Sequence, residues 1–387
     1  MVRHVATNNA PFQYATLDDA AIYGAAVDDP QGFIRGFDGP VVIDEVQRVP
    51  DLFRAIKLAV DRDRQPGRYI LTGSANVFML PTASESLAGR MEIQTLWPFS
   101  QGELLGVRDE FVDRVFAGAL PGMAGPALGR HALADILARG GYPEACTRSD
   151  AGRRGRWFAN YVSSILQRDI RDIAGIDHLS VMPRLLSILA ARSSTLLNYA
   201  ELARSVGLPQ TTLKRYCTLL ETTFLLHFIP AWTENVGKRL TRSPKVCLCD
   251  TGLACHLMGI DAERMTADPT VLGKLLESFT ALELMKQISW SKTRATLYHY
   301  RTAAGQEIDF LMETPDGSVA CVEVKASETI SKEDFRHLIG LRDQLKGRFR
   351  QGILLHAGSE TVSFGDRMWA MPIASLWQGS PNHTTRD

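Results

Sequence analysis

Two kinds of hydrophobic pattern alternate along the 387 residues of the chain. Short β-branched runs without polar alternation occur near the N-terminus, as in VVI at 41–43, and are typical of strands buried on both faces. Between about 131 and 260 the apolar positions recur every three to four residues, as in YVSSILQRDIRDI at 161–173, which predicts helices. From 296 onward strand patterns return in LYHYR, EIDFLME and VACVEVKAS. The chain is therefore predicted to be a mixed α/β protein.

These patterns predict three domains. An α/β domain is expected over 1–115, a helical domain over 131–260 and a second α/β domain over 262–387. A Gly-, Pro- and Ala-rich stretch, FAGALPGMAGPALGR at 116–130, separates the first two. The length agrees with this division, because domains of roughly 150 residues are common.

Composition narrows the class of protein. A hydrophobic content of 45% can fill several cores and excludes a disordered chain. The 43 Lys and Arg balance the 43 Asp and Glu, which argues against global steering toward nucleic acid but leaves local basic patches open. The most apolar stretch, FLLHFIPAW at 224–232, is shorter than the ~18 residues that would span a bilayer. Six scattered Cys and no secretory signal indicate a soluble cytoplasmic protein without a membrane partner.

Two adjacent carboxylates follow the first buried run. Asp44 and Glu45 come directly after VVI, at the carboxyl end of a predicted strand, where open α/β sheets bind ligands. Asp44 is suited to hold Mg²⁺ through its water shell, and Glu45 to orient or deprotonate an attacking water. The alternative is an ordinary helix cap after a strand.

A second buried run, YILTGSAN at 69–76, ends in the hydroxyl and amide side chains of Thr72, Ser74 and Asn76. Thr72 and Ser74 would lie at the tip of the neighbouring strand, within reach of a γ-phosphate or its attacking water. Arg90 follows in SESLAGRMEI and suits an arginine finger, because a planar guanidinium matches a transferring phosphoryl group. The alternative for Arg90 is a surface salt bridge.

Together these motifs resemble a large prokaryotic family of predicted AAA-type ATPases that carry a C-terminal domain of unknown function. The resemblance extends over DEVQRVPDLFRAIKLAVDRDR, GRYILTGSAN, SESLAGRMEI, GGYPEA, SPKVCLCDTGLACHLMG, LLESFTALELMKQ, YRTAAGQEIDFLME and VEVKAS. It implies ATP and Mg²⁺ as cofactors, with Asp44 and Glu45 as the Walker B pair, Ser74 or Thr72 as the sensor and Arg90 as the finger. Because a finger usually acts on a neighbouring subunit's nucleotide, the resemblance also implies a homo-oligomer.

The sequence departs from that family at the phosphate loop. Family members begin with a Gly-rich loop ending in Gly-Lys-Ser/Thr, and no G-x-x-x-x-G-K-[ST] motif occurs here. The backbone N–H groups and the Lys of such a loop hold the β- and γ-phosphates. We therefore expect a truncated P-loop AAA-type core that binds nucleotide weakly. Either the start lies upstream of Met1, or the chain is a shortened relative that acts as a non-catalytic nucleic-acid or protein interaction module.

The middle segment contains a helix-turn-helix pattern. A capping-box pattern opens the helix NYAELARSV, which stops at Gly207, and a second helix follows in QTTLKRYCTLLETT. The apolar face of the second helix carries Leu213, Tyr216 and Leu220. Its polar face carries the candidate nucleic-acid contacts, which are Gln210, Thr211, Lys214 and Arg215.

The charge of this region agrees with DNA as a partner. Residues 145–245 carry 15 Lys and Arg against 7 Asp and Glu within a neutral chain. A basic helix-turn-helix is a DNA-binding hypothesis, so we expect a winged-helix-like domain. The alternative is a small packing domain beside an ATPase.

Two strands near the C-terminus are predicted to form a hairpin. EIDFLME at 307–313 and VACVEVKAS at 319–327 flank a Pro-Asp-Gly turn. The five-residue loop pairs Glu313 with Val319, so Asp309 falls opposite Glu323. Two carboxylates with Lys325 two residues further on make a divalent-metal site beside a scissile phosphate.

This arrangement resembles the PD-(D/E)xK nuclease superfamily, which implies a restriction-endonuclease-like α/β domain. The resemblance implies Glu277, in LLESFTALELMKQ, as an upstream acid. The predicted metal ligands are therefore Glu277, Asp309 and Glu323, with Lys325 as the catalytic cation of a Mg²⁺-dependent nuclease. The alternatives are an exposed polar hairpin face and an inactive scaffold.

Overall fold

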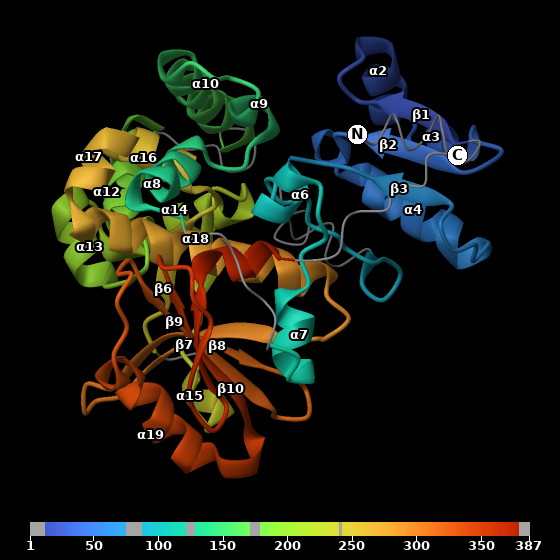
Figure 1. The fold of residues 1–387 in the computed structure, drawn as a ribbon. Coiled ribbons are helices and arrows are strands. Elements are labelled where there is room, and N and C mark those ends of the chain that lie inside the picture. Colours follow the sequence, from blue (N-terminus) through green and yellow to red (C-terminus); the bar gives the residue numbers. More distant parts are fainter. Residues whose placement is uncertain (1–11, 75–86, 121–127, 171–178, 240–241, 379–387) are drawn as a thin grey trace. The chain divides into compact units, whose positions relative to one another are not determined.

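The computed structural model describes residues 12–74, 87–120, 128–170, 179–239 and 242–378. The chain divides into two compact units. The first holds residues 1–94, 168–175 and 218–224, and the second holds 95–167, 176–217 and 225–387. Both units combine helices with sheets, so the predicted α/β fold class is confirmed (Figure 1).

A three-stranded parallel sheet forms the centre of the first unit. Its order is β1 (Gln13–Thr16), β2 (Val41–Asp44) and β3 (Tyr69–Leu71). The first three residues of β2 are fully buried, which explains why VVI shows no polar alternation. Between residues 12 and 74, the helices are α2 (Ala20–Asp28), α3 (Pro30–Arg35), η1 (Val46–Arg48) and α4 (Asp51–Arg62).

The apolar face of α4 holds this sheet in place. Leu52, Phe53 and Ile56 are buried in one hydrophobic cluster with Val41 and Ile43 of β2. Burying side chains of this size contributes about 1.5–3 kcal/mol each relative to exposure. The packing fixes the carboxyl end of β2, where the first candidate site begins.

A six-stranded mixed sheet lies in the C-terminal part of the second unit. Its order is β11-β12-β10-β9-β8-β7, in which β7, β8 and β9 form an antiparallel meander and β9, β10 and β12 run parallel. The strands are β7 (Thr296–Arg301), β8 (Glu307–Glu313), β9 (Val319–Lys325), β10 (Phe349–His356), β11 (Val362–Gly365) and β12 (Met368–Pro372). The short helices η5 (Lys332–Phe335) and η6 (Lys346–Arg348) flank α19 (Arg336–Leu345), and η7 (Ile373–Trp377) follows β12.

Helices dominate the chain between residues 101 and 290. They are α6 (Gln101–Leu105), α7 (Phe111–Ala117), α8 (Arg130–Arg139), α9 (Pro143–Cys146), α10 (Ala151–Ser164), η3 (Ile165–Ile170), η4 (Leu179–Val181), α12 (Met182–Ala191), α13 (Tyr199–Val206), α14 (Gln210–Thr222), α15 (Val236–Arg239), α16 (Thr251–Met258), α17 (Ala262–Ala267) and α18 (Pro269–Trp290). A small sheet of order β4-β6-β5 lies among them, built from β4 (Thr195–Leu196), β5 (Leu226–Ile229) and β6 (Lys245–Leu248).

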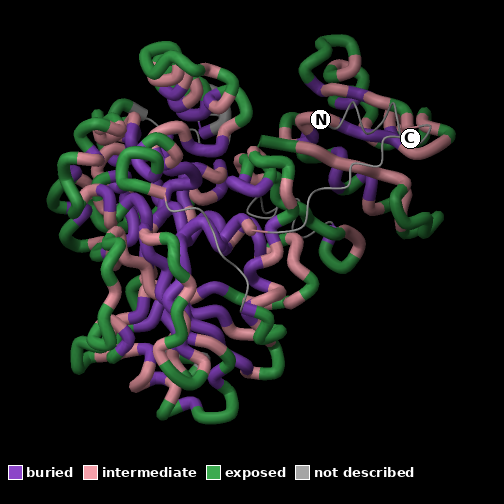
Figure 2. Tube along the Cα trace, in the orientation of Figure 1, coloured by how far each residue is buried: buried purple, intermediate pink, exposed green. Residues whose placement is uncertain are grey.

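Helix α18 connects the helical part of the second unit with its large sheet. It contacts α8, α16 and α17 on the helical side, and β6, β7 and β9 among the strands (Figure 1). Twelve of its residues are buried, and they lie around its whole circumference, as expected for a helix enclosed by other elements. Figure 2 shows buried positions running through α18 and the strands.

Two local predictions from the sequence are confirmed. Asn198 caps α13 by accepting hydrogen bonds from the N–H groups of Ala200 and Glu201, and Gly207 ends the helix with a φ of +77°. In the C-terminal hairpin, Glu313 pairs with Val319, as the loop length predicts. The C-terminal domain that the sequence predicts falls in the second unit, and so does the predicted middle domain except for residues 168–175 and 218–224, so the three-domain division stays a prediction.

None of the helices in the described ranges is long and apolar enough to cross a membrane.

The segment that opens the second unit is held by buried polar groups. The Oγ of Ser100 donates a hydrogen bond to Asp109, and the Gln101 N–H donates to Glu283 of α18 at 3.0 Å. The Nζ of Lys286 donates to Glu283 at 2.8 Å and to the Phe99 carbonyl at 2.9 Å. Burial raises the pKa of Asp109 to about 7, against the lowering effect of the Ser100 hydrogen bond.

The raised pKa of Asp109 predicts a pH-dependent stability. Between about pH 4 and pH 7 the folded chain keeps a proton on Asp109 that the unfolded chain releases, so this group's contribution to the unfolding free energy falls as the pH rises. As the pH rises through this range, the unfolding free energy of Asp109→Asn should increase relative to that of the unaltered protein, by up to about 1.4 kcal/mol per pH unit. Urea unfolding at pH 5, 6 and 7 measures the difference. Parallel pH profiles for the two proteins would contradict the prediction.

Candidate functional site

The first candidate site lies where the parallel strands of the first unit end. Asp44 is the last residue of β2, and its partner in β1 is Thr16. One carboxylate oxygen of Asp44 accepts a hydrogen bond from the Tyr14 hydroxyl at 2.6 Å, and the other accepts one from the Thr72 hydroxyl, just after β3. The predicted proximity of Asp44 and Thr72 is therefore present.

Glu45 and Ser74 are joined through a third side chain. The Nε2 of Gln47 donates to the Glu45 carboxylate and lies 3.2 Å from the Ser74 Oγ. Glu45 has a φ of +60°, a conformation that costs energy for a residue with a Cβ and is typical of functional positions. Its side chain makes no capping hydrogen bond to η1, which argues against the alternative that it is a helix cap.

Arg90 forms a salt bridge within the first unit. Its Nε and Nη2 donate to the two carboxylate oxygens of Asp61 at 2.6 and 3.1 Å, and its Nη1 donates to the Ala88 carbonyl at 3.1 Å. The pKa of Asp61 is lowered by this hydrogen bonding. The salt bridge that the sequence left open as an alternative is thus present, and an arginine finger stays a prediction.

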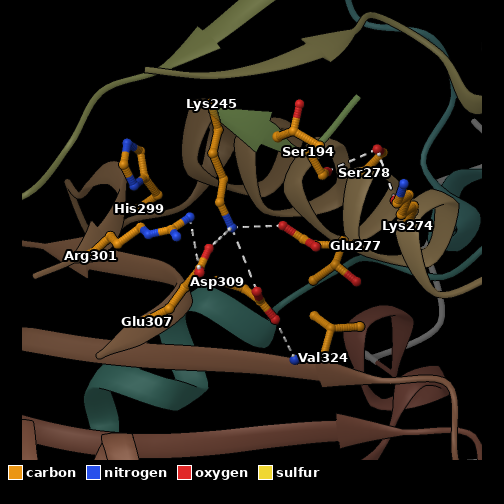
Figure 3. Close-up of polar contacts among 12 residues, drawn as sticks. Ser194, Lys245, Lys274, Glu277, Ser278, His299, Arg301, Glu307, Asp309 and Val324 are labelled. Carbon is orange, nitrogen blue, oxygen red and sulfur yellow. Dashed lines mark hydrogen bonds and ion pairs between the residues drawn. The ribbon is translucent and has the colours of Figure 1, made fainter. Parts of the chain in front are cut away.

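The second candidate site is a buried lysine among carboxylates (Figure 3). Lys245 is the first residue of β6, and its side chain is 2% exposed. Its Nζ lies 2.7 Å from Glu277 Oε1 of α18, and 3.5 and 3.6 Å from Asp309 Oδ1 and Glu307 Oε1 of β8. We call these four residues the lysine–carboxylate cluster.

The predicted hairpin pair adjoins this cluster. Asp309 Oδ2 accepts a hydrogen bond from the Val324 N–H at 2.9 Å, and the Asp309 N–H donates to Glu323 Oε2 at 3.4 Å. The Nζ of Lys325 lies 3.9 Å from Glu323 Oε1, and its side chain is 40% exposed. The structure therefore brings together the four residues that the sequence predicted for the tail, which are Glu277, Asp309, Glu323 and Lys325.

Burial changes the acidity of these groups. Burial and, next, the neighbouring Asp309 carboxylate raise the pKa of Glu277 to about 7 and that of Glu323 to about 8. Burial alone would lower the pKa of Lys245, but the carboxylates of Glu277 and Asp309 outweigh it and raise that pKa. Lys245 is therefore a permanent cation at neutral pH.

The candidate nucleic-acid contacts lie on the surface of α14. Gln210, Thr211, Lys214 and Arg215 are exposed, whereas Leu213, Tyr216 and Leu220 are buried, so the two predicted faces of the helix are confirmed. The Nζ of Lys214 lies 5.4 Å from the ring centroid of Tyr199 on α13. DNA contact by these residues stays a prediction.

Comparisons with known proteins divide the chain at similar places. Residues 1–105 match an AAA domain, 130–264 match a domain of unknown function (DUF8612) and 272–376 match a domain of unknown function (DUF4143). Uncharacterized proteins of Mycobacterium tuberculosis and Mycobacterium bovis are each 32% identical over 303 residues, which is 78% of this chain and 62% of each relative. The chain thus matches less than two thirds of these relatives. No solved structure matches it significantly.

These matches support an AAA-type ATPase-like family with a C-terminal domain of unknown function.

In the AAA segment, sequence reasoning found the carboxylates but missed two of their partners. Tyr14 and Gln47 bond Asp44 and Glu45, and neither residue type is tied to a standard motif at that spacing. The sequence does contain one indication for Gln47: it lies only two residues after Glu45, close to the same end of β2.

The sequence motifs gave no indication of the cation that lies among the acids of the C-terminal domain of unknown function. Lys245 belongs to the preceding matched segment and opens a strand, KVCL, whose four residues are all buried. A lysine inside an otherwise apolar strand needs a buried counter-charge, and that rule would have singled it out. Glu307 was missed as well, although its alternation with Asp309 places both on one face.

Proposed function

We propose that the AAA-type segment hydrolyses ATP with Mg²⁺ at the carboxyl edge of its parallel sheet. The observation that carries the proposal is the placement of Asp44 at the end of β2, bonded to the Thr72 hydroxyl from the neighbouring strand. Ligands of open α/β sheets bind at such strand ends. The match of residues 1–105 to an AAA domain supports the same activity.

The side chains present suit the implied cation. Mg²⁺ prefers oxygen ligands and usually keeps several waters, so the Asp44 carboxylate and the Thr72 hydroxyl fit its chemistry. When bound, the ion would neutralise charge on the nucleotide phosphates.

Glu45 is placed to act on the attacking water. The amide of Gln47 donates a hydrogen bond to its carboxylate and also reaches the Ser74 hydroxyl, which orients the Glu45 side chain at the end of β2. A carboxylate held in this way can accept a proton from water.

The hydrolysis proposal predicts a specific effect of Glu45→Gln. The change keeps the shape and the contact with Gln47 but removes the proton acceptor, so kcat should fall about 10²-fold or more while nucleotide affinity is kept. Because no Gly-Lys-Ser/Thr loop occurs in the sequence, the assay should use millimolar Mg-ATP. Glu92→Gln, an exposed acid of the same unit, is the matched control. Undetectable hydrolysis by the unaltered protein, or equal kcat for Glu45→Gln, would contradict the proposal.

DNA binding is a second proposed function, carried by the basic exposed face of α14. Helices α13 and α14 meet at the Gly207 turn, and the β5–β6 pair follows them, an order that resembles a helix-turn-helix with a wing. The face that α14 exposes carries amide, hydroxyl and cationic side chains, which are the groups that contact bases and phosphates.

If the exposed face of α14 binds DNA, removing its positive charges should lower the affinity for DNA and make that affinity less dependent on salt. Replacing Lys214 and Arg215 by Ala should weaken binding of duplex DNA and reduce the slope of log K against log salt by about 2, one unit for each phosphate contact. Fluorescence anisotropy at several salt concentrations measures both quantities. Ala at Lys332 and Arg336, two exposed cations elsewhere in the second unit, is the matched control. Equal losses in the two double variants would contradict a specific role for α14.

The C-terminal domain is proposed to carry a nuclease-like metal site. Its support is that Glu277 and Asp309 share the ammonium group of Lys245, and that Asp309 bonds Glu323, which lies beside Lys325. With the side chains as they lie, no three acidic, His or Cys residues of the described ranges are grouped closely enough to hold one metal ion. Lys245 lies among the same carboxylates and bears directly on whether a metal can enter.

A further inference from the structure

The position of Lys245 relative to the proposed metal ligands is the starting point. Its Nζ bridges Glu277 and Asp309, which come from α18 and β8, at 2.7 and 3.5 Å (Figure 3). These are two of the three carboxylates proposed to hold the metal. The ammonium group therefore lies at the place where a cation shared by these two residues would lie.

A divalent ion and this ammonium group would compete for the same oxygen atoms. Hard divalent cations bind carboxylate oxygens at roughly 2.0–2.6 Å. Asp309 Oδ2 accepts the Val324 N–H, and Oδ1, which faces Lys245, is the oxygen that a cation shared with Glu277 would contact. Two cations sharing that oxygen inside a buried site would repel each other strongly, because the surroundings screen charge poorly.

The backbone that carries Lys245 is fixed on both sides. β6 is the middle strand of its sheet, and Lys245 is paired with Leu196 of β4 and with Ile229 of β5. The side chain has its ammonium group 5.7 Å from the Phe310 ring centroid and is almost fully enclosed.

The connection that leads from β5 to Lys245 is fastened to the large sheet. The Trp232 N–H donates to the His299 carbonyl at 2.7 Å, and the His299 N–H donates to the Pro230 carbonyl at 3.0 Å. Further along, Arg239 forms a two-contact ion pair with Glu313 at 2.5 and 3.2 Å. Moving the backbone that carries Lys245 away from the large sheet would require these contacts to break.

We propose that Lys245 takes the place of the divalent cation in this cluster and thereby keeps metal out of it. The proposal rests on the assignment of Glu277, Asp309 and Glu323 as metal ligands. The lysine comes from the helical segment and the carboxylates from the α18–β8–β9 region, so the contact is an autoinhibitory one within the second unit. If the domain cleaves DNA, it does so only after Lys245 has left.

Removal of the charge at Lys245 tests the proposal. In the full chain, Lys245→Gln should bind Mn²⁺ at least tenfold more tightly than the unaltered protein, and Mn²⁺ should raise its melting temperature by mass action. Free Mn²⁺ is measured by electron paramagnetic resonance, and melting by circular dichroism. Lys245→Met serves as a second neutral variant if the glutamine variant does not fold.

Three control variants separate charge from packing. Lys245→Arg keeps the positive charge and should exclude Mn²⁺ as the unaltered protein does. Lys274→Gln removes an exposed lysine of α18 and should change nothing. Adding Asp309→Asn to Lys245→Gln should abolish the gained Mn²⁺ binding.

The outcomes are distinguishable. Equal Mn²⁺ affinity in the unaltered protein and both neutral variants would overturn the role of Lys245, while leaving a metal site in place. Absence of Mn²⁺ binding in folded neutral variants would overturn the inference and the metal ligands together. Mn²⁺ binding by Lys245→Gln without nicking of plasmid DNA would support the role of Lys245 and contradict the nuclease proposal.

Discussion

The burial of one lysine among three carboxylates is the constraint that organises the second unit. Lys245, Glu277 and Asp309 come from β6, α18 and β8, elements that are separated by tens of residues in the chain. A buried charge is tolerated only when it is paired, and removing one partner of such a pair typically costs about 3–5 kcal/mol. The small β4-β6-β5 sheet, helix α18 and the large sheet must therefore keep one arrangement, because only that arrangement keeps the charge of Lys245 paired.

The two candidate sites hold their acids in opposite ways. Asp44 and Glu45 accept hydrogen bonds from the hydroxyl groups of Tyr14 and Thr72 and from the amide of Gln47, which orient the two carboxylates. In the second unit the partner is an ammonium group, which cancels charge as well as orienting it. The second arrangement therefore already contains a cation. This contrast is why ATP hydrolysis and a cation-blocked nuclease-like site are assigned to different units.

The strand and helix patterns of this chain predict those structural features that are set by residues close together in the sequence. The hairpin register that joins Glu313 to Val319 follows from side-chain alternation and a short loop, and the two faces of α14 follow from helical spacing. The end of β2 could likewise be located, because a fully apolar run stops at Asp44. These features need no knowledge of the rest of the fold.

What could not be predicted depends on contacts between distant segments. Tyr14 reaches Asp44 from 30 residues away, and Lys245 reaches Asp309 from another matched segment of the chain. The residues beside Ser100 are similar, since the partners of Gln101 and Phe99 are Glu283 and Lys286 of α18. Of these residues, only Lys245 could be identified from the sequence pattern, because it is a charged residue in an otherwise apolar strand.

Diffraction from crystals of the unaltered protein soaked in MnCl₂ tests the central claim most directly. An anomalous difference map at the manganese edge locates the ion without reference to activity. Exclusion by Lys245 predicts no peak among Glu277, Asp309 and Glu323, with the Lys245 Nζ still beside Glu277. A manganese peak at roughly 2.0–2.6 Å from the Asp309 carboxylate, with Lys245 in the same position, would contradict the account.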